Sequence, residues 1–129
     1  MMKLRIKGDS LRLRVSRSEV EHFFGGERIE ETIHFSSEPG ANLTYVLQAA
    51  ADGGGTAVDY KSGNVTVLLS KIHIDSWRDA SQVGVYASIN LGQGISLELI
   101  VEKDFACLDR RDEDNADTFP NPLEDTARR

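Results

Sequence analysis

The sequence predicts an α+β fold in which one strand–strand–helix–strand–strand unit is used twice. An internal repeat supports this, because residues 13–23 reappear as residues 67–77 at a shift of 54 positions (70 minus 16). A constant period indicates a supersecondary unit that was copied. Short segments also alternate charged and apolar residues, the period of half-buried strands. Eight antiparallel strands with two short helices are therefore expected, and such a hairpin-rich sheet tends to curl or to close into a barrel.

The first copy is predicted to contain four strands and one helix. A turn at Gly8 separates the first two strands, which identifies them as a hairpin. Ser16 is the expected N-cap of the helix, and Glu19 three residues later completes a capping box. The glycine pair that starts at Gly25 ends the helix, as glycine often does at a helix C-terminus. The strands are expected at about residues 3–7, 11–15, 28–35 and 43–50.

The second copy repeats this plan. Ser70 occupies the N-cap position of the second helix, and Ile74 and Trp77 are expected to face the core from it. Trp77 and Phe23 occupy equivalent positions in the two copies and are predicted to be buried. The strands are expected at about residues 57–61, 65–69, 83–90 and 95–102.

The 129 residues suit one domain, with repeats at about 2–51 and 56–105 and an extended C-terminal tail at 106–129. The net charge of −6 argues against general affinity for nucleic acid or for an anionic membrane. No apolar run is long enough for a membrane helix, and the amino terminus has no signal-peptide core. A single cysteine, Cys107, excludes an internal disulfide framework, so we expect a cytoplasmic protein.

A basic hairpin face is the candidate binding site. Side chains alternate across a strand, so Arg5 and Lys7 share one side of the first strand. Arg12 and Arg14 share one side of the second strand in the same way. Four cations on one face destabilise a hairpin unless an anion neutralises them. A bound phosphate would do so, because arginine pairs with phosphate through a planar two-point fork.

The alternative interpretation is a solvated outer face balanced by carboxylates on neighbouring strands. These carboxylates would be Glu30, Glu31, Glu98 and Glu102. The opposite side of the hairpin is apolar, which places the basic side outside the core. In the second copy, Thr66 and Leu68 occupy the positions of Arg12 and Arg14, so a symmetric pair of sites is not expected.

The acidic segment 109–117 also has two interpretations. Its carboxylates are hard oxygen ligands of the kind that calcium prefers, but the segment lacks the glycine and terminal glutamate of an EF-hand loop. The favoured interpretation is an intramolecular cover, in which the tail lies along the basic face. Cys107 is predicted to be a small buried hydrophobe, and the three histidines show no metal-ligand spacing. The sequence thus predicts no catalytic residue, no metal site and no cofactor.

Two segments carry a resemblance to known proteins: the opening from Met2 to Arg14, and the tail with the strings EKDFACL and DEDNADTFPNP. They resemble a family of small bacterial proteins of unknown function, and this resemblance implies no activity. The repeated unit is more weakly similar to the triphosphate tunnel (CYTH-type) superfamily, which builds an eight-stranded barrel. That superfamily opens with a Glu-x-Glu-x-Lys strand, where this chain has Lys3-Leu4-Arg5-Ile6-Lys7.

The function that these observations favour is a non-catalytic binding or interaction module. The alternative is a protein that binds or hydrolyses phosphate or polyphosphate, as the similarity to the tunnel superfamily implies. The expected partner is a small anionic ligand or another protein, and an oligomer is compatible with the predicted strands.

Overall fold

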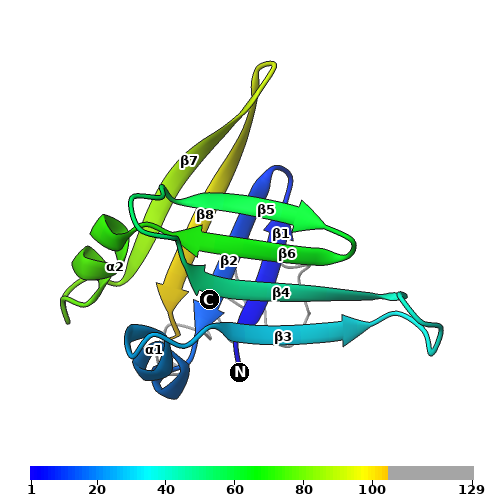
Figure 1. Cartoon of the computed structure of the whole chain (residues 1–129), viewed down its shortest axis with the longest axis horizontal. Helices are drawn as coiled ribbons and strands as arrows, with labels where there is room; N and C mark the ends of the chain where they lie inside the picture. The colour runs from blue at the N-terminus through cyan, green and yellow to red at the C-terminus, as the bar shows by residue number, and fades with distance from the viewer. Residues whose placement is uncertain (105–129) are drawn as a thin grey trace, which may run out of the picture.

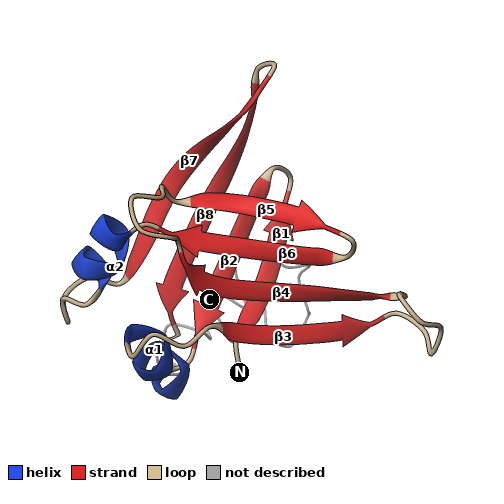
Figure 2. Ribbon diagram, in the orientation of Figure 1, coloured by secondary structure: helices blue, strands red, loops and turns tan. Residues whose placement is uncertain are grey.

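The computed structural model describes residues 1–104, which form two four-stranded sheets and two short helices. Figure 1 shows the strands of one sheet crossing in front of those of the other, and Figure 2 shows both helices at one side of the sheets. The elements are β1 (Lys3–Lys7), β2 (Ser10–Val15), α1 (Arg17–Phe24), β3 (Ile29–His34), β4 (Asn42–Ala49), β5 (Ala57–Lys61), β6 (Asn64–Leu69), α2 (Lys71–Trp77), β7 (Gly84–Gly92) and β8 (Ile95–Lys103).

Each sheet combines one hairpin from each half of the chain. The first sheet has the order β1-β2-β8-β7, and the second has the order β3-β4-β6-β5. The outer pairs are antiparallel, whereas the central pairs β2·β8 and β4·β6 are parallel. The α+β class is thus confirmed.

The prediction of eight antiparallel strands in one curled sheet or closed barrel was wrong, and the likeness to the tunnel barrel is not supported. Alternation within a strand identifies its apolar face, but it does not identify the partner strand. The parallel pairs join strands that do not follow one another in the chain, so no turn sequence predicts them. Hairpins could be predicted because their turns are local.

The central parallel pairs of the two sheets have equivalent registers. In the first sheet Ser10 lies opposite Glu98, and in the second Asn64 lies opposite Thr44. The shift between equivalent residues is 54 in both cases (64 minus 10 and 98 minus 44). The β1·β2 and β5·β6 hairpins correspond at the same shift, in agreement with the repeat in the sequence, whereas β7·β8 is offset by two residues from β3·β4.

The core lies between the sheets and extends to the two helices. Trp77 is fully buried and Phe23 is 4% exposed, which confirms both as core residues. The Phe23 and Trp77 rings lie 6.0 Å apart, and Phe24 meets Trp77 edge-on at 5.4 Å. Such tilted aromatic contacts are favourable arrangements of ring quadrupoles. The inner residues of the strands complete the cluster, among them Leu13, Leu47, Val67, Leu69, Leu99 and Val101.

The predicted helix caps are present. The Ser16 side chain accepts a hydrogen bond from the Glu19 N–H, and the Glu19 side chain accepts one from the Ser16 N–H, so the capping box is confirmed. Ser70 caps α2 by accepting from the His73 N–H. Gly26 follows α1 with a φ of 101°, a backbone angle that glycine adopts without a steric penalty.

Neither helix in the described part of the chain is long and apolar enough to span a membrane. The predictions for Cys107 and for the tail at 106–129 lie outside the described residues.

Candidate functional site

The four predicted cations lie on the outer face of the first sheet. Arg5 on β1 is directly opposite Arg12 on β2, and Lys3 is opposite Arg14. The alternate residues of β2 face the core, where Leu13 is fully buried. Lys3 therefore joins the predicted set, and we call these five residues the cationic surface: Lys3, Arg5, Lys7, Arg12 and Arg14.

A carboxylate on β8, that of Glu102, lies beside the two arginines of the cationic surface that belong to β2. The Nε atoms of Arg12 and Arg14 lie 3.5 Å and 3.6 Å from the same oxygen of Glu102. Glu102 is positioned there because the parallel register places it opposite Arg14. The negative charge of this carboxylate, placed beside two guanidinium groups, offsets part of the repulsion between the cations.

Other predicted balancing carboxylates have different positions. Glu98 lies on the same face, where its side chain accepts a 2.9 Å hydrogen bond from the Ser88 hydroxyl. Glu30 and Glu31 belong to β3 of the second sheet, so they do not balance the cationic surface. Asp104 does so in their place, with a carboxylate oxygen 3.1 Å from Lys3 Nζ. Sequence reasoning missed this pair because Asp104 follows the last strand.

The cationic surface adjoins an apolar and hydroxyl-bearing region on β7 and β8. The register runs across all four strands, from Arg5 through Arg12 and Ile100 to Tyr86. The Tyr86 hydroxyl donates a 3.1 Å hydrogen bond to Glu102. Partial burial, this hydrogen bond and the Glu102 charge raise the pKa of Tyr86, and Arg12 opposes them. The phenol therefore stays protonated and remains a donor at neutral pH.

The charge on this face has the opposite sign to the charge of the chain. Among residues 1–104, this face carries five cations and the three carboxylates of Glu98, Glu102 and Asp104, whereas the whole sequence carries −6. Within residues 1–104, Arg5 and Lys7 make no ion pair. A local positive potential on an acidic protein attracts acidic groups selectively.

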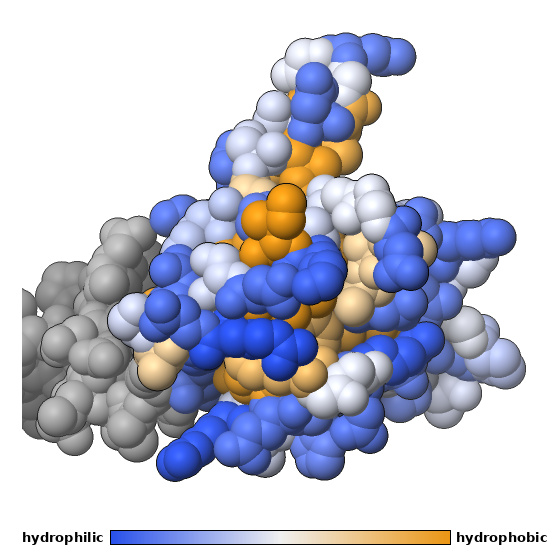
Figure 3. Space-filling view, turned by 60° about the vertical axis from the view of Figure 1, so that its left-hand side comes forward, coloured by the Kyte–Doolittle hydropathy of each residue, from blue (hydrophilic) through white to orange (hydrophobic). Residues whose placement is uncertain are grey.

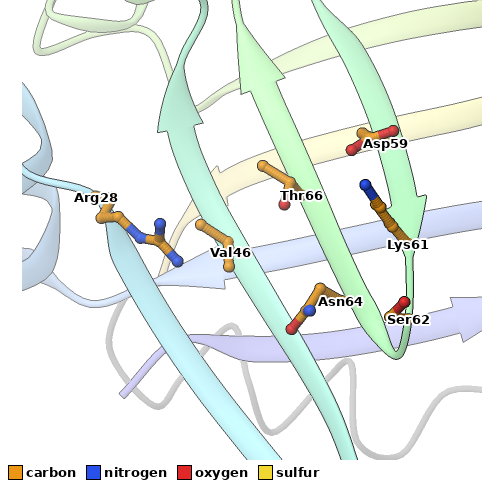
Figure 4. A pocket seen from close by; sticks show the side chains of 7 residues that line it. All are labelled: Arg28, Val46, Asp59, Lys61, Ser62, Asn64 and Thr66. Carbon is orange, nitrogen blue, oxygen red and sulfur yellow. The ribbon is translucent and has the colours of Figure 1, made fainter.

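The outer face of the second sheet carries an open depression of about 430 Å³. Figure 4 shows Arg28 and Lys61 at its two sides, with Val46 and Thr66 between them. Val46 is only 2% exposed and forms its apolar floor. The lining residues are Arg28, Val46, Asp59, Lys61, Ser62, Asn64 and Thr66.

This depression occupies the position in the second half that the cationic surface occupies in the first. Asp59 and Thr66 are the counterparts of Arg5 and Arg12 at the shift of 54 (59 minus 5 and 66 minus 12). The two halves thus keep the same backbone and differ in the charge of the outer face. Sequence reasoning did not identify the depression, because Arg28 and Val46 join its other residues only through the parallel pairing of β4 with β6.

The three histidines are not brought together. His22 Nδ1 lies 2.5 Å from a carboxylate oxygen of Glu27, and His73 Nδ1 contacts the Thr56 hydroxyl. His34 belongs to β3. Among residues 1–104 there is no group of three histidine, cysteine or acidic side chains that could hold a metal ion.

The comparison with known proteins gives a family without an activity. No curated protein matches the chain by sequence. Residues 2–123 match a protein family described as a family of unknown function (DUF7009). This match confirms the similarity to a family of unknown function that the opening and tail segments indicated. The chain therefore belongs to this family of unknown function.

Proposed function

We propose that this protein is a non-catalytic binding module whose cationic surface holds an extended, acidic protein segment. The observation that carries the proposal is the cross-strand array of five cations beside Ile100 and Tyr86. An acidic segment supplies carboxylates for the cations, and its apolar side chains contact Ile100 and the Tyr86 ring. Arginine suits this role because its fork pairs with a carboxylate at two points.

The spacing of the cations favours a chain molecule over a single phosphate. Lys3, Arg5 and Lys7 point to one side of β1, so they are spread over about 14 Å at roughly 3.4 Å per residue. One phosphate contacts one or two of these groups, whereas carboxylates along an extended segment contact all of them. A phosphate or polyphosphate ligand is therefore the alternative that the experiment must exclude.

The sequence of this chain contains a candidate competitor for the same surface. The structure describes the chain up to Asp104, whose carboxylate pairs with Lys3 at the edge of the cationic surface. Segment 109–117, which follows, contains five acidic residues: Asp109, Asp112, Glu113, Asp114 and Asp117. We include in the proposal that this segment competes with the partner for the cationic surface.

The test uses the full chain and a labelled synthetic peptide with the sequence of residues 109–123. The receptor carries asparagine or glutamine at the five acidic positions of 109–117, which removes the competitor and keeps the chain length. Fluorescence anisotropy should show that this receptor binds the peptide more tightly than the unaltered chain does. Binding should weaken as salt is raised, because exposed ion pairs are screened.

Matched variants locate the binding site. Arg5→Glu combined with Lys7→Glu should weaken peptide binding by about tenfold, a loss of about 1.4 kcal/mol. Lys61→Glu is the control, because Lys61 is the counterpart of Lys7 on the second sheet (61 minus 7 is 54). Equal losses in both variants, or no binding to the amide-bearing receptor, would contradict the proposal. Displacement of the peptide by tripolyphosphate at equal charge would favour the phosphate alternative.

Two further statements belong to this proposal. We place the protein in the cytoplasm, which is supported by the single cysteine in 129 residues. We also propose that the two halves arose by duplication of one unit, which is supported by the sequence repeat and by the equivalent registers. In this proposal the two halves diverged after duplication, so that Arg12 and Arg14 of the first half correspond to Thr66 and Leu68 of the second.

A further inference from the structure

Each sheet has two edge strands, and one of the four differs from the rest. The edges are β1 and β7 in the first sheet and β3 and β5 in the second. An edge strand offers unpaired backbone groups to other chains, and charged side chains normally discourage such pairing. Three edge strands carry these charges, but the nine residues of β7, GVYASINLG, include no Asp, Glu, Lys or Arg. The charged residues of the other edges are Lys3, Arg5, Lys7, Glu30, Glu31, Asp59 and Lys61.

The β7–β8 hairpin also projects beyond the second sheet, as Figure 1 shows at the top of the view. Its core-facing side leads from the buried Leu99 to the hairpin tip, where Leu91 and Ile95 are 53% and 49% exposed. Figure 3 shows apolar colouring on this projecting hairpin. The uncharged edge and the uncovered apolar tip are therefore features of the same hairpin.

We infer that β7 pairs antiparallel with β7 of a second copy of this chain around a two-fold axis. A two-fold axis brings each strand against itself, so a charged strand would oppose like charges. Strand β7 avoids this repulsion because it is neutral. With the axis near Ser88, Leu91 of one copy lies opposite Val85 of the other, so each exposed Leu91 lies against the strand of the second copy. A second copy thus pairs with the free edge and covers Leu91 at the end of the paired segment.

The pairing segment is limited by contacts at the start of β7. The Gln82 side chain donates to the Gly84 carbonyl at 3.0 Å. The preceding Val83 carbonyl faces β8, because it accepts from the Lys103 N–H. The loop after α2 therefore occupies the first part of this edge. The segment 86–91 remains, and within residues 1–104 no strand pairs with it on the side away from β8. The axis is then close to Ser88.

This arrangement has a geometric consequence for the first sheet. The two-fold axis between antiparallel neighbours is perpendicular to the sheet, so both copies turn the same face outward. The dimer then has one continuous eight-stranded sheet with both cationic surfaces on one side. The dimer would hold whether or not the proposed acidic partner is correct, because the self-association test contains no ligand.

Sedimentation equilibrium of the full chain over about 5–100 μM tests the dimer, since self-association follows protomer concentration. We expect a mass near twice 14.3 kDa at the upper end of this range. Ser88→Lys should raise the dimer dissociation constant by at least about tenfold, because two lysines would meet near the axis. The monomer tolerates this cation, since Ser88 lies beside Glu98. Leu91→Lys should have the same effect, and circular dichroism verifies that both variants fold.

Phe35→Lys is the matched control. Phe35 is 69% exposed and follows the edge strand β3, so the change removes a similar exposed apolar group away from β7. The dimer dissociation constant of this variant should equal that of the unaltered chain. A monomer throughout the concentration range overturns the inference. So does a dimer that Phe35→Lys weakens while Ser88→Lys leaves it intact. If Leu91→Lys fails to fold, Ser88→Lys decides alone.

Discussion

At the residue scale, Glu19 joins the amino terminus to the first helix. Its carboxylate accepts hydrogen bonds from the Met2 N–H at 2.9 Å and from the Ser16 hydroxyl at 2.7 Å, and it lies 3.4 Å from the terminal ammonium of Met1. The Met2 side chain is fully buried, and its carbonyl accepts a 3.1 Å hydrogen bond from Tyr45. Glu19 therefore fixes a buried residue as well as capping α1.

These contacts determine how Glu19 titrates. Partial burial acts to raise its pKa, but the hydrogen bonds from Ser16, the terminal charge and the Met2 N–H outweigh it, so the pKa is lowered from 4.5. A carboxyl whose pKa is lowered by folding stabilises the folded state above its ordinary pKa. That contribution is lost as the pH falls through the lowered value.

We predict that Glu19→Gln lowers the free energy of unfolding by about 1–2 kcal/mol at pH 7. The difference from the unaltered chain should shrink below pH 4.5, where protonation removes the same charge. Urea unfolding at pH 7 and at about pH 3 measures both quantities. Glu21→Gln is the control, since its side chain is 73% exposed on the same helix. A difference that is equal at both pH values would contradict the role of ionised Glu19.

The second half satisfies the same backbone group with different residues. His73 occupies the place of Glu19, and Thr56 occupies the place of Met2 (73 minus 19 and 56 minus 2 are both 54). The Thr56 hydroxyl accepts the 2.9 Å hydrogen bond from the Ser70 N–H that a glutamate would otherwise accept. The sequence predicted Ser70 as a cap because that signal is local, but the Thr56 contact joins residues 14 positions apart and has no local signal.

At the element scale, one glycine allows β7 and β8 to approach closely. A Cβ atom at Gly84 would lie 2.6 Å from the Val101 carbonyl oxygen and 2.9 Å from Glu102 Cγ. The carbonyl belongs to the central strand of the first sheet, so it cannot move without disturbing the ladder. By contrast, a Cβ atom at Gly55 would meet nothing within 4 Å.

Gly84→Ala should therefore lower the free energy of unfolding by about 2 kcal/mol or more, since backbone overlap in a packed sheet is not relieved by a side-chain rotation. Gly55→Ala is the matched control and should change it by no more than about 0.5 kcal/mol, because the substitution meets open space. Thermal and urea unfolding of the two variants give the comparison. If Gly84→Ala lowered the free energy of unfolding as little as Gly55→Ala does, β7 would be able to shift away from β8 without loss of stability.

The elements themselves were predicted well, because their signals are short-range. Each strand forms within two residues of its expected bounds, and each helix begins directly after its expected N-cap. The partners of the central strands could not be predicted, because alternation in β2 is equally compatible with β8 or with another strand. The prediction of the candidate site was incomplete for the same reason. Its arginines were evident from β1 and β2, whereas Glu102 and Tyr86 join them only through the parallel register.

At the scale of the whole molecule, one backbone carries two differently charged outer faces. On the second sheet, Asp59 and Thr66 stand where the first sheet has Arg5 and Arg12. Thr44 and Gln48 stand where it has Glu98 and Glu102 (98 minus 44 and 102 minus 48 are both 54). Fold and charge therefore vary independently in this chain, since the apolar inner residues specify the core and the outer residues specify binding.

This independence predicts that a second binding surface can be added. Asp59→Arg with Thr66→Arg places arginines at the counterparts of Arg5 and Arg12, beside the existing Lys61. Titration calorimetry with the peptide 109–123, using the chain with amides in 109–117, should then show two peptides per chain where the parent receptor binds one. Affinity at the added surface should be weaker and fall with salt, because Val46 and the acidic Glu30 replace Ile100 and Tyr86 there. Asp59→Asn with Thr66→Val adds no cation to the site and should leave one peptide per chain. A single peptide on the arginine variant, with binding at the original surface intact, would show that the equivalent backbone does not suffice.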